Sequence, residues 1–362
     1  MATPTTQSSP LSLKRTIHPV GQGAFYSEQF FNKDTKTPLF TVVYDCGGYK
    51  SELQREIKTL SRLDAVFISH FHNDHTNGLS DLKAINSNAL VVIPGISHAR
   101  FIVDLISAVL RTSSVSSPTV AFMLSCIPAL KSKKAKSTIK FQMPPEQGCC
   151  SAGKEEILVV PTGTRTFVRI ESSFKWIYEI SYNESDISKE TALIRALAEI
   201  LPSLKELLSD IDTYRDSEWY EKNLLPDLSA IIDDFGKVKK VYSDTFGKDH
   251  NSYSMLVYSH SENNLVKNSD CLYTGDAERS VANEKSIQSV GAHYIQVPHH
   301  GSSHNHSANY YVRRQIAFMS VGKNNTYGHP GRSTIIDTTR ICPYIHIITE
   351  DSNSKFKQRF IL

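Results

Sequence analysis

The sequence is poor in several features that would each mark a particular class of protein. Only 6 of its 362 residues are cysteine, too few for a disulfide-stapled scaffold, which favours reduced thiols in a cytosolic protein. No apolar run approaches the roughly 20 residues of a membrane-spanning helix, and the N-terminus has no apolar signal-peptide core. The net charge of +3 excludes the strongly basic composition of a protein that wraps nucleic acid. These deficits predict a cytoplasmic, globular protein that does not contact a membrane.

Short apolar runs alternate with helical patterns along much of the chain. The runs that predict strands are 39–44, 65–68, 89–93, 157–170, 174–180, 255–259, 271–274, 294–297 and 317–321. Helices are expected over 51–63 and 101–110. Such alternation favours a layered α/β fold. We expect a single domain over 12–362, preceded by a disordered Ser-, Thr- and Pro-rich segment over 1–11.

A segment at about 186–246 predicts a helical insertion in this domain. Its apolar residues step by 4, 3, 4, 3 and 4 positions, the period of an amphipathic helix, at Leu193, Leu197, Ile200, Leu204, Leu207 and Ile211. Pro202 predicts a kink or a break within this pattern, and a further helix is expected over 216–235. The insertion can dock a protein partner, mediate self-association or act as a lid. The alternative is a plain helical pair on the outside of the fold.

Metal-binding side chains gather directly after the expected strand at 65–68. His70, His72, Asp74 and His75 form the pattern H-x-H-x-D-H. Neutral imidazoles and carboxylates are ligands that zinc and related divalent metals prefer. Four such groups on one short loop cannot all bind one ion comfortably. We therefore expect His70 and His72 to face one ion and Asp74 and His75 to face another, although a histidine-rich loop without metal is the simpler alternative.

The pattern resembles the hallmark of the metallo-β-lactamase fold superfamily, and further motifs extend the resemblance. Asp45, in V-V-Y-D-C-G-G, matches an aspartate that supports the metal loop without binding metal. Asp276, in Y-T-G-D-A-E, matches the aspartate that bridges both metals. V-G-Q-G at 20–23, H-H-G-S at 299–302 and S-V-G-x-N-N-x-Y-G-H-P at 320–330 are similar to the soluble domain of ComEC-type DNA-uptake proteins. The resemblance implies a four-layer αββα sandwich.

The same resemblance implies roles for histidines in the C-terminal half. His300 would bind the metal that Asp74 and His75 face, whereas His299 would face the substrate. Two neighbouring residues at the end of a strand would point in different directions, which fits this division. His329 would contact a substrate phosphate or brace its own loop.

Two positions fit the family pattern less directly. His250, in D-H-N-S-Y-S, matches a third metal motif and would join His70 and His72. The same segment also fits the pattern N-x-x-S, which has no histidine ligand, so a loop histidine remains the alternative. Ala24 stands where the ComEC-like pattern usually has an acidic residue, and no role is transferred to it.

The implied cofactors are two divalent metal ions, zinc first and manganese as the alternative. Such a pair lowers the pKa of a bridging water from about 15.7 to about 7, which yields a hydroxide for hydrolysis. Asp74 and Asp276 would orient this nucleophile, and His299 or His329 would donate a hydrogen bond or a proton to the substrate. No serine or cysteine nucleophile is required.

Three functions fit this reading. The motif set favours a phosphodiesterase, most simply a nuclease, with a nucleic acid or nucleotide phosphodiester as substrate. The second is a hydrolase of a phosphorylcholine ester, a thioester or a lactam. The third is an effector subunit controlled by a partner that docks through the helical insertion.

Overall fold

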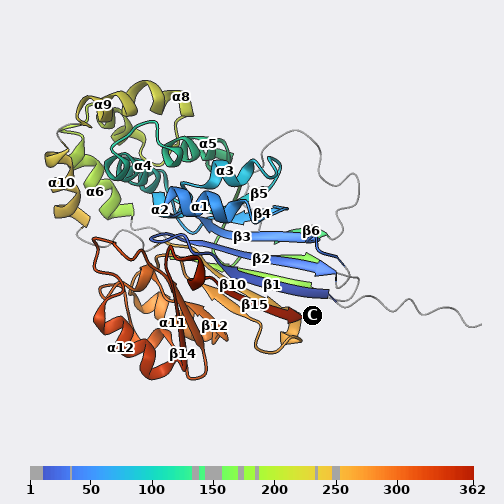
Figure 1. Ribbon diagram of the computed structural model, residues 1–362. Helices are drawn as coiled ribbons and strands as arrows, with labels where there is room; N and C mark the ends of the chain where they lie inside the picture. The colour runs from blue at the N-terminus through green and yellow to red at the C-terminus, as the bar shows by residue number, and fades with distance from the viewer. Residues whose placement is uncertain are drawn as a thin grey trace, which may run out of the picture.

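Two β-sheets lie face to face between two helical layers in the computed structural model (Figure 1). The structure describes residues 11–32, 35–132, 138–142, 157–169, 175–183, 187–232, 235–246 and 253–362. In order, the first sheet contains β15 (Phe356–Ile361), β1 (Leu11–Ile17), β2 (Phe25–Asn32), β3 (Phe40–Cys46), β4 (Ala65–Phe67), β5 (Leu90–Pro94) and β7 (Ile157–Val160). The second contains β14 (Tyr344–Ile348), β13 (Ile316–Ser320), β12 (Tyr294–Gln296), β11 (Cys271–Tyr273), β10 (Leu256–Ser261), β9 (Lys175–Ser181), β8 (Arg165–Arg169) and β6 (Thr138–Gln142).

The helices cover the two outer faces of this sandwich (Figure 1). Over the first sheet lie α1 (Lys50–Ile57), α2 (Asn73–Thr76), α3 (Leu79–Lys83), α4 (His98–Thr112) and α5 (Pro118–Ser132). Over the second sheet lie α11 (Val281–Val290) and α12 (Arg332–Ile341). The predicted αββα sandwich is confirmed.

The alternation of side chains along the strands explains the four layers. In β3, Val42 and Tyr44 point into the space between the sheets, whereas Val43 packs on the helical side. In β11, Tyr273 points between the sheets and Leu272 points towards the opposite helical layer. Successive residues of a strand face opposite sides, so strands covered on both faces are apolar throughout. Three apolar clusters therefore fill the three spaces between the layers.

The predicted insertion forms a series of short helices on the outside of α4 and α5. They are α6 (Ile187–Leu197), α7 (Ser203–Leu207), α8 (Ser217–Trp219), the π-helical turn η2 (Tyr220–Leu224), α9 (Leu225–Ala230) and α10 (Gly236–Phe246). The predicted break at Pro202 is confirmed, because α6 ends before it and α7 begins after it. Leu193 and Leu197 are fully buried in the same apolar cluster as α4 and α5. The insertion is thus continuous with the outer helical layer.

Some predicted boundaries are wrong. Leu11 already belongs to β1, so the predicted disordered segment is one residue too long, and its other residues lie outside the described part. The expected strand over 157–170 is two strands in different sheets, β7 and β8, separated by a turn in which Gly163 has φ +82°. The expected strand over 174–180 corresponds to β9, which pairs with β8. Helix α5 is not among the predicted elements, because the serine-rich segment 113–117 before it is typical of a loop. Within the described residues, no helix has the length and apolarity needed to cross a bilayer.

Candidate active site

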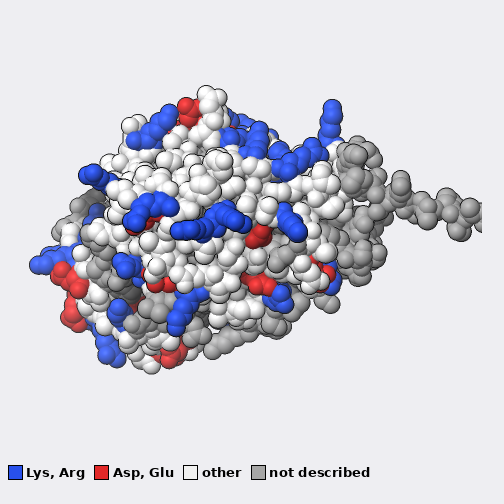
Figure 2. Space-filling model, turned by 90° about the horizontal axis from the view of Figure 1, so that it is seen from below, with Lys and Arg blue, Asp and Glu red and all other residues white. Residues whose placement is uncertain are grey.

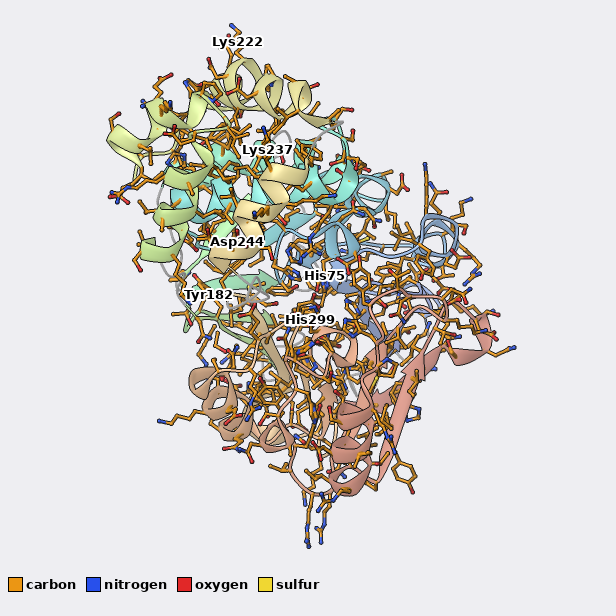
Figure 3. The ribbon with its side chains drawn as sticks, turned by 90° about the vertical axis from the view of Figure 1, so that its left-hand side faces the viewer. His75, Tyr182, Lys222, Lys237, Asp244 and His299 are labelled. Carbon is orange, nitrogen blue, oxygen red and sulfur yellow. The ribbon has the colours of Figure 1, made fainter. Side chains whose placement is uncertain are left out.

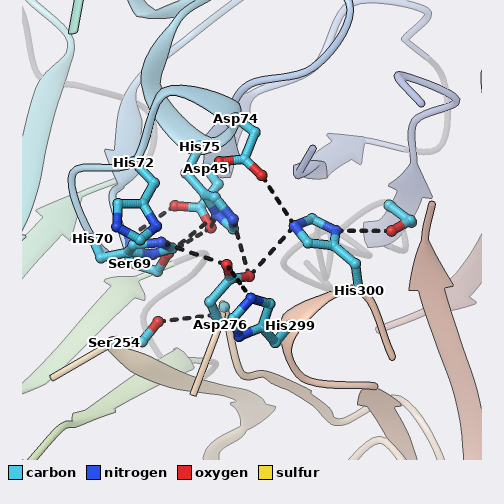
Figure 4. Close-up of polar contacts among 12 residues, drawn as sticks. Asp45, Ser69, His70, His72, Asp74, His75, Ser254, Asp276, His299 and His300 are labelled. Carbon is cyan, nitrogen blue, oxygen red and sulfur yellow. Dashed lines mark hydrogen bonds and ion pairs between the residues drawn. The ribbon is translucent and has the colours of Figure 1, made fainter. Parts of the chain in front are cut away.

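The candidate site lies where strands of both sheets end at one edge (Figure 4). β4 leads into the loop that begins at His70, β11 leads to Asp276, and β12 leads to His299 and His300. β3 and β4 are parallel, as are β11, β12 and β13, so the carboxyl ends of each set lie at one edge of its sheet. Gln296 fixes the turn before Asp276, because its Oε1 accepts the N–H groups of Thr274 and Gly275 at 2.9 and 3.1 Å.

Six of the seven residues predicted to bind metal lie in the described part of the chain, and the structure brings all six together. Their ligand atoms form two groups, in each of which all atoms lie within 4.8 Å of one another. The groups are His70, His72 and Asp276, and Asp74, His75, Asp276 and His300. Asp276 belongs to both groups, which is the arrangement a bridging carboxylate requires. His250 lies outside the described residues, so its role stays a prediction.

Hydrogen bonds orient the histidine rings of this cluster. His75 Nδ1 donates to Asp45 Oδ2 at 2.7 Å, and His300 Nδ1 donates to the Ser320 carbonyl at 2.8 Å. Ser69 Oγ lies 2.9 Å from His70 Nδ1 and donates its own proton to Asp45, so this ring also donates from Nδ1. A neutral imidazole that donates from Nδ1 keeps a lone pair on Nε2. These contacts therefore turn three Nε2 atoms towards the cluster, each of which offers a lone pair when its ring is neutral.

The inward-facing atoms are buried. Nε2 of His70 and of His72 make no hydrogen bond with any described residue. Nε2 of His75 lies 3.1 Å from Asp276 Oδ1, and Nε2 of His300 lies 3.3 Å from Asp74 Oδ2. Buried imidazole nitrogens and carboxylate oxygens thus converge with few hydrogen-bond donors between them, and these are the ligand atoms that zinc and related divalent cations prefer.

The pKa shifts within the cluster are also consistent with binding of cations. Burial holds the pKa values of His70 and His72 well below their usual value, so both rings are neutral. Burial also lowers the pKa of His75, but the carboxylates of Asp276 and Asp45 outweigh it and raise that pKa well above its usual value. The pKa of Asp276 is held well below its usual range, because nearby histidines, His299 first, outweigh the opposing effect of burial. The buried carboxylates are therefore stabilised by positive charge. The proton on His75 supplies such charge in one donor group, and divalent cations could supply it in both groups.

Asp45 holds the cluster from behind without joining it. Its backbone has φ +54°, and its carboxylate accepts from Ser69 N–H, Ser69 Oγ and His75 Nδ1, each at 2.7 Å. The next loop residue but one, Gly47, packs on the peptide between Asp74 and His75, where a Cβ atom would approach to 2.2 Å. The close fit explains why this strand end carries D-C-G-G.

We expect Asp45→Asn to weaken metal binding by about 10- to 100-fold while the protein stays folded, because the amide nitrogen cannot accept from its present donors. Metal content after dialysis against a graded chelator measures the effect. Asp64→Asn is the matched control, since Asp64 also accepts a backbone N–H at a strand of the same sheet but stands at the opposite end of β4. Equal metal retention in both variants would contradict the orienting role of Asp45.

A polar cleft of about 340 Å³ opens above this cluster. Its walls come from the loops that carry the motifs and from α4: Gln22, Gly48, Tyr49, Asn73, Asp74, Asn77, Arg111, Asp276, His299, His300, Asn324, Asn325, Thr326, Tyr327 and His329. Predicted residues His299, His300 and His329 are among them. The Tyr49 ring packs between the loop that contains Gly21 and the loop that contains Gly322, and it holds these two loops together. No described residue of the insertion lines the cleft, although α10 runs from Lys237 to Asp244 towards the region of His75 and His299 (Figure 3).

The structure corrects the predicted backbone of the histidine pair. β12 ends at Gln296, and His299 and His300 lie in a short helical turn with φ values of +50° and +52°. The two rings nevertheless face different surroundings, as predicted. The His300 side chain is 3% exposed, and that of His299 is 24% exposed. The backbone of Ala24 supports the metal loop, because its N–H donates to the Asp74 carbonyl at 3.1 Å.

Comparisons with known proteins give one partial family match and distant structural neighbours. Residues 38–128 match the family model of the metallo-beta-lactamase superfamily. Among solved structures, the metallo-beta-lactamase fold protein YhfI from Bacillus subtilis matches 96% of this chain and 99% of its own at 9% identity and a TM-score of 0.39. A long-form RNase Z from yeast matches 88% of this chain and 38% of its own at 7% identity and a TM-score of 0.38. No curated protein sequence gives a significant match.

Proposed function

We propose that this chain is a metal-dependent hydrolase of phosphodiesters, most simply a nuclease. Residues 38–128 match the metallo-beta-lactamase superfamily model, which supports the proposal. Proteins of this superfamily are usually hydrolases that bind divalent metals. The observation that carries the proposal is the pair of donor groups that share Asp276 at the foot of a polar cleft. ComEC-like motifs that form the cleft walls favour a phosphodiester over other bonds.

The donor set fits two divalent cations, zinc first and manganese as the alternative. His70 and His72 would hold one ion, with His250 as a further candidate, and Asp74, His75 and His300 would hold the other, with Asp276 between them. Bound there, such ions would supply Lewis acidity and a water acidified to near neutrality. The protein contributes the fixed orientation of each ligand and a largely buried floor.

His299 is suited to donate a hydrogen bond to the substrate. Asn305 Nδ2 donates to its Nδ1, so the proton of the neutral ring lies on Nε2, 3.7 Å from Asp276 Oδ2. Burial lowers the pKa of His299, which keeps the ring neutral. An N–H group held at the foot of the cleft can stabilise charge that develops on a phosphate oxygen.

His329 and Arg111 complete the polar surroundings. Burial, together with His299 and His300, lowers the pKa of His329 to about 4, so this ring is also neutral at pH 7. Arg111 is exposed and is the one arginine or lysine among the described residues that line the cleft. A permanent positive charge beside the cluster suits an anionic diester better than a lactam or a thioester. Docking of a partner through the insertion remains a separate proposal.

A substrate panel with defined metals tests this function. We expect the purified chain to bind two equivalents of zinc or manganese and to cleave single-stranded DNA or RNA and a bis-aryl phosphate. A chelator should abolish cleavage and metal addition should restore it. His72→Ala should lose metal and activity, whereas His346→Ala, on the distant edge strand β14, should lose neither. Cleavage of only a lactam, thioester or phosphorylcholine ester, or activity that survives chelation, would contradict the proposal.

A further inference from the structure

One aromatic side chain in the cleft has no part in the hydrolytic centre. Tyr327 is 68% exposed, and its ring stacks on His329 with centroids 5.9 Å apart and planes 15° apart. Its loop is tied by Asn325, whose amide donates to the carbonyls of Gly322 and His329, each at 2.7 Å, and accepts the N–H of His329 at 3.0 Å. A large ring is therefore held at the cleft rim, with one face backed by His329.

A row of rings connects this rim with the ligand cluster. The centroids of His300 and His299 are 6.3 Å apart, those of His299 and His329 are 5.7 Å apart, and Tyr327 follows as the next ring. A phosphate placed at His299 would thus lie within two ring spacings of the exposed tyrosine. This separation is within the reach of neighbouring nucleotides of one strand, with a phosphate at His299 and a base on Tyr327.

The cleft carries its positive charge on a different element. Arg111 lies in the last turn of α4 and lines the cleft together with Asp74 and Asp276. Asn73, beside it in the lining, is held by Thr119 of α5, whose hydroxyl donates to its Oδ1 at 3.1 Å. One element thus offers a cation for a phosphate, while the 322–329 loop offers an aromatic face.

The charge on the face seen in Figure 2 is not gathered into one patch. On the face seen in Figure 2, basic side chains are scattered among acidic and uncharged ones. Such a surface attracts polyanions weakly and without fixed register. The cleft is where a cation and an exposed aromatic ring lie near the reacting centre.

From this juxtaposition we propose that Tyr327 is a base-stacking subsite and Arg111 a phosphate-binding residue for single-stranded nucleic acid. The inference rests on the proposed phosphodiesterase function and specifies its substrate class. A base of a single strand can stack on a protein ring, whereas the bases of a duplex are already stacked on each other. Stacking is tolerant of sequence, so the subsite selects strand state and not base identity.

Binding of an oligonucleotide that contains 2-aminopurine tests the subsite without relying on catalysis. Titrations are done in chelator, so the strand stays intact, and both affinity and stacking-induced quenching are measured. We expect Tyr327→Ala to bind about 10-fold more weakly and to lose the quenching, and Tyr327→Phe to keep both. Arg111→Gln should weaken binding, keep the quenching and reduce the slope of log affinity against log salt by about 1. A duplex of the same length should bind equally to the parent and to Tyr327→Ala.

The outcomes separate the subsite from the proposed function. Unchanged affinity and quenching in Tyr327→Ala would overturn the subsite, even if the parent cleaves phosphodiesters. Equal weakening of duplex and single-strand binding by Tyr327→Ala would also overturn it. Tyrosine-dependent binding by a chain that hydrolyses no phosphodiester with any metal would support the subsite and refute the phosphodiesterase function.

Discussion

Asp276→Asn should lower kcat/KM by well over about 100-fold, more than the loss caused by disturbing residues behind the ligands. Asp276 is the one residue shared by both donor groups, and its side chain is 3% exposed. Asparagine has the same shape but no charge and only one oxygen, so it could not serve both proposed ions at once. Metal content, measured together with cleavage of a bis-aryl phosphate, should fall in parallel with activity.

Two comparison variants make this result specific. Ser254 Oγ accepts the N–H of Asp276 at 3.0 Å, so Ser254→Ala should give a smaller loss through misplacement of the same carboxylate. Asp270→Asn is the matched control, because Asp270 precedes the opposite end of β11 and accepts the N–H of His293. All three proteins should keep the parental circular dichroism spectrum. Full activity or full metal content in folded Asp276→Asn would show that the carboxylate does not bridge two ions.

Much of the ligand cluster could be predicted because each part directly follows a strand. His70, His72 and His75 lie on one short loop, which cannot direct all three rings to a single ion. Their division between the two donor groups could therefore be predicted. The role of Asp45 came from its motif and is matched by its three accepted hydrogen bonds. Asp276 was likewise placed by a motif, and the parallel strands bring it to the same edge.

The cleft walls could not be predicted, since they depend on long-range packing. Arg111 carries no motif, and only the direction of α4 brings it into the cleft lining with Asp74. The locking of Tyr49 between Gly21 and Gly322 depends on how two distant loops meet. The period of side chains along 157–170 shows that the segment is extended, but it cannot show that β7 and β8 join different sheets. A Pro-Thr-Gly turn before Thr164 was the available signal.

A buried ionic network joins the helical insertion to the candidate site. Arg100 and Asp104 of α4 pair at 2.8 Å, and Glu190 of α6 lies 3.9 Å from Arg100. Tyr253 donates to Asp104 at 2.6 Å, and its ring lies 6.5 Å from that of His70. The residue after Tyr253 is Ser254, which holds Asp276. The network therefore runs from the insertion to the shared carboxylate.

We expect Asp104→Asn to reduce the free energy of unfolding by about 3 to 5 kcal/mol, because it leaves the Arg100 guanidinium buried without its closest carboxylate. Urea denaturation measures this loss. Tyr253→Phe removes one hydrogen bond to a charged group and should cost about 1.5 to 3 kcal/mol. Hydrogen exchange should also become faster in α6 in Asp104→Asn, and metal should be released more readily.

A buried pair elsewhere separates this local effect from general destabilisation. Glu28 pairs with Arg15 at 2.7 Å between the two sheets, and both side chains are almost fully buried. Glu28→Gln should therefore destabilise the protein by a similar amount, but it should not accelerate exchange in α6 selectively. If Asp104→Asn and Glu28→Gln give the same exchange pattern and the same metal retention, the α4 network stabilises the fold without coupling the insertion to the site. A selective change in Asp104→Asn would show that the position of α6 and the geometry around Asp276 depend on each other.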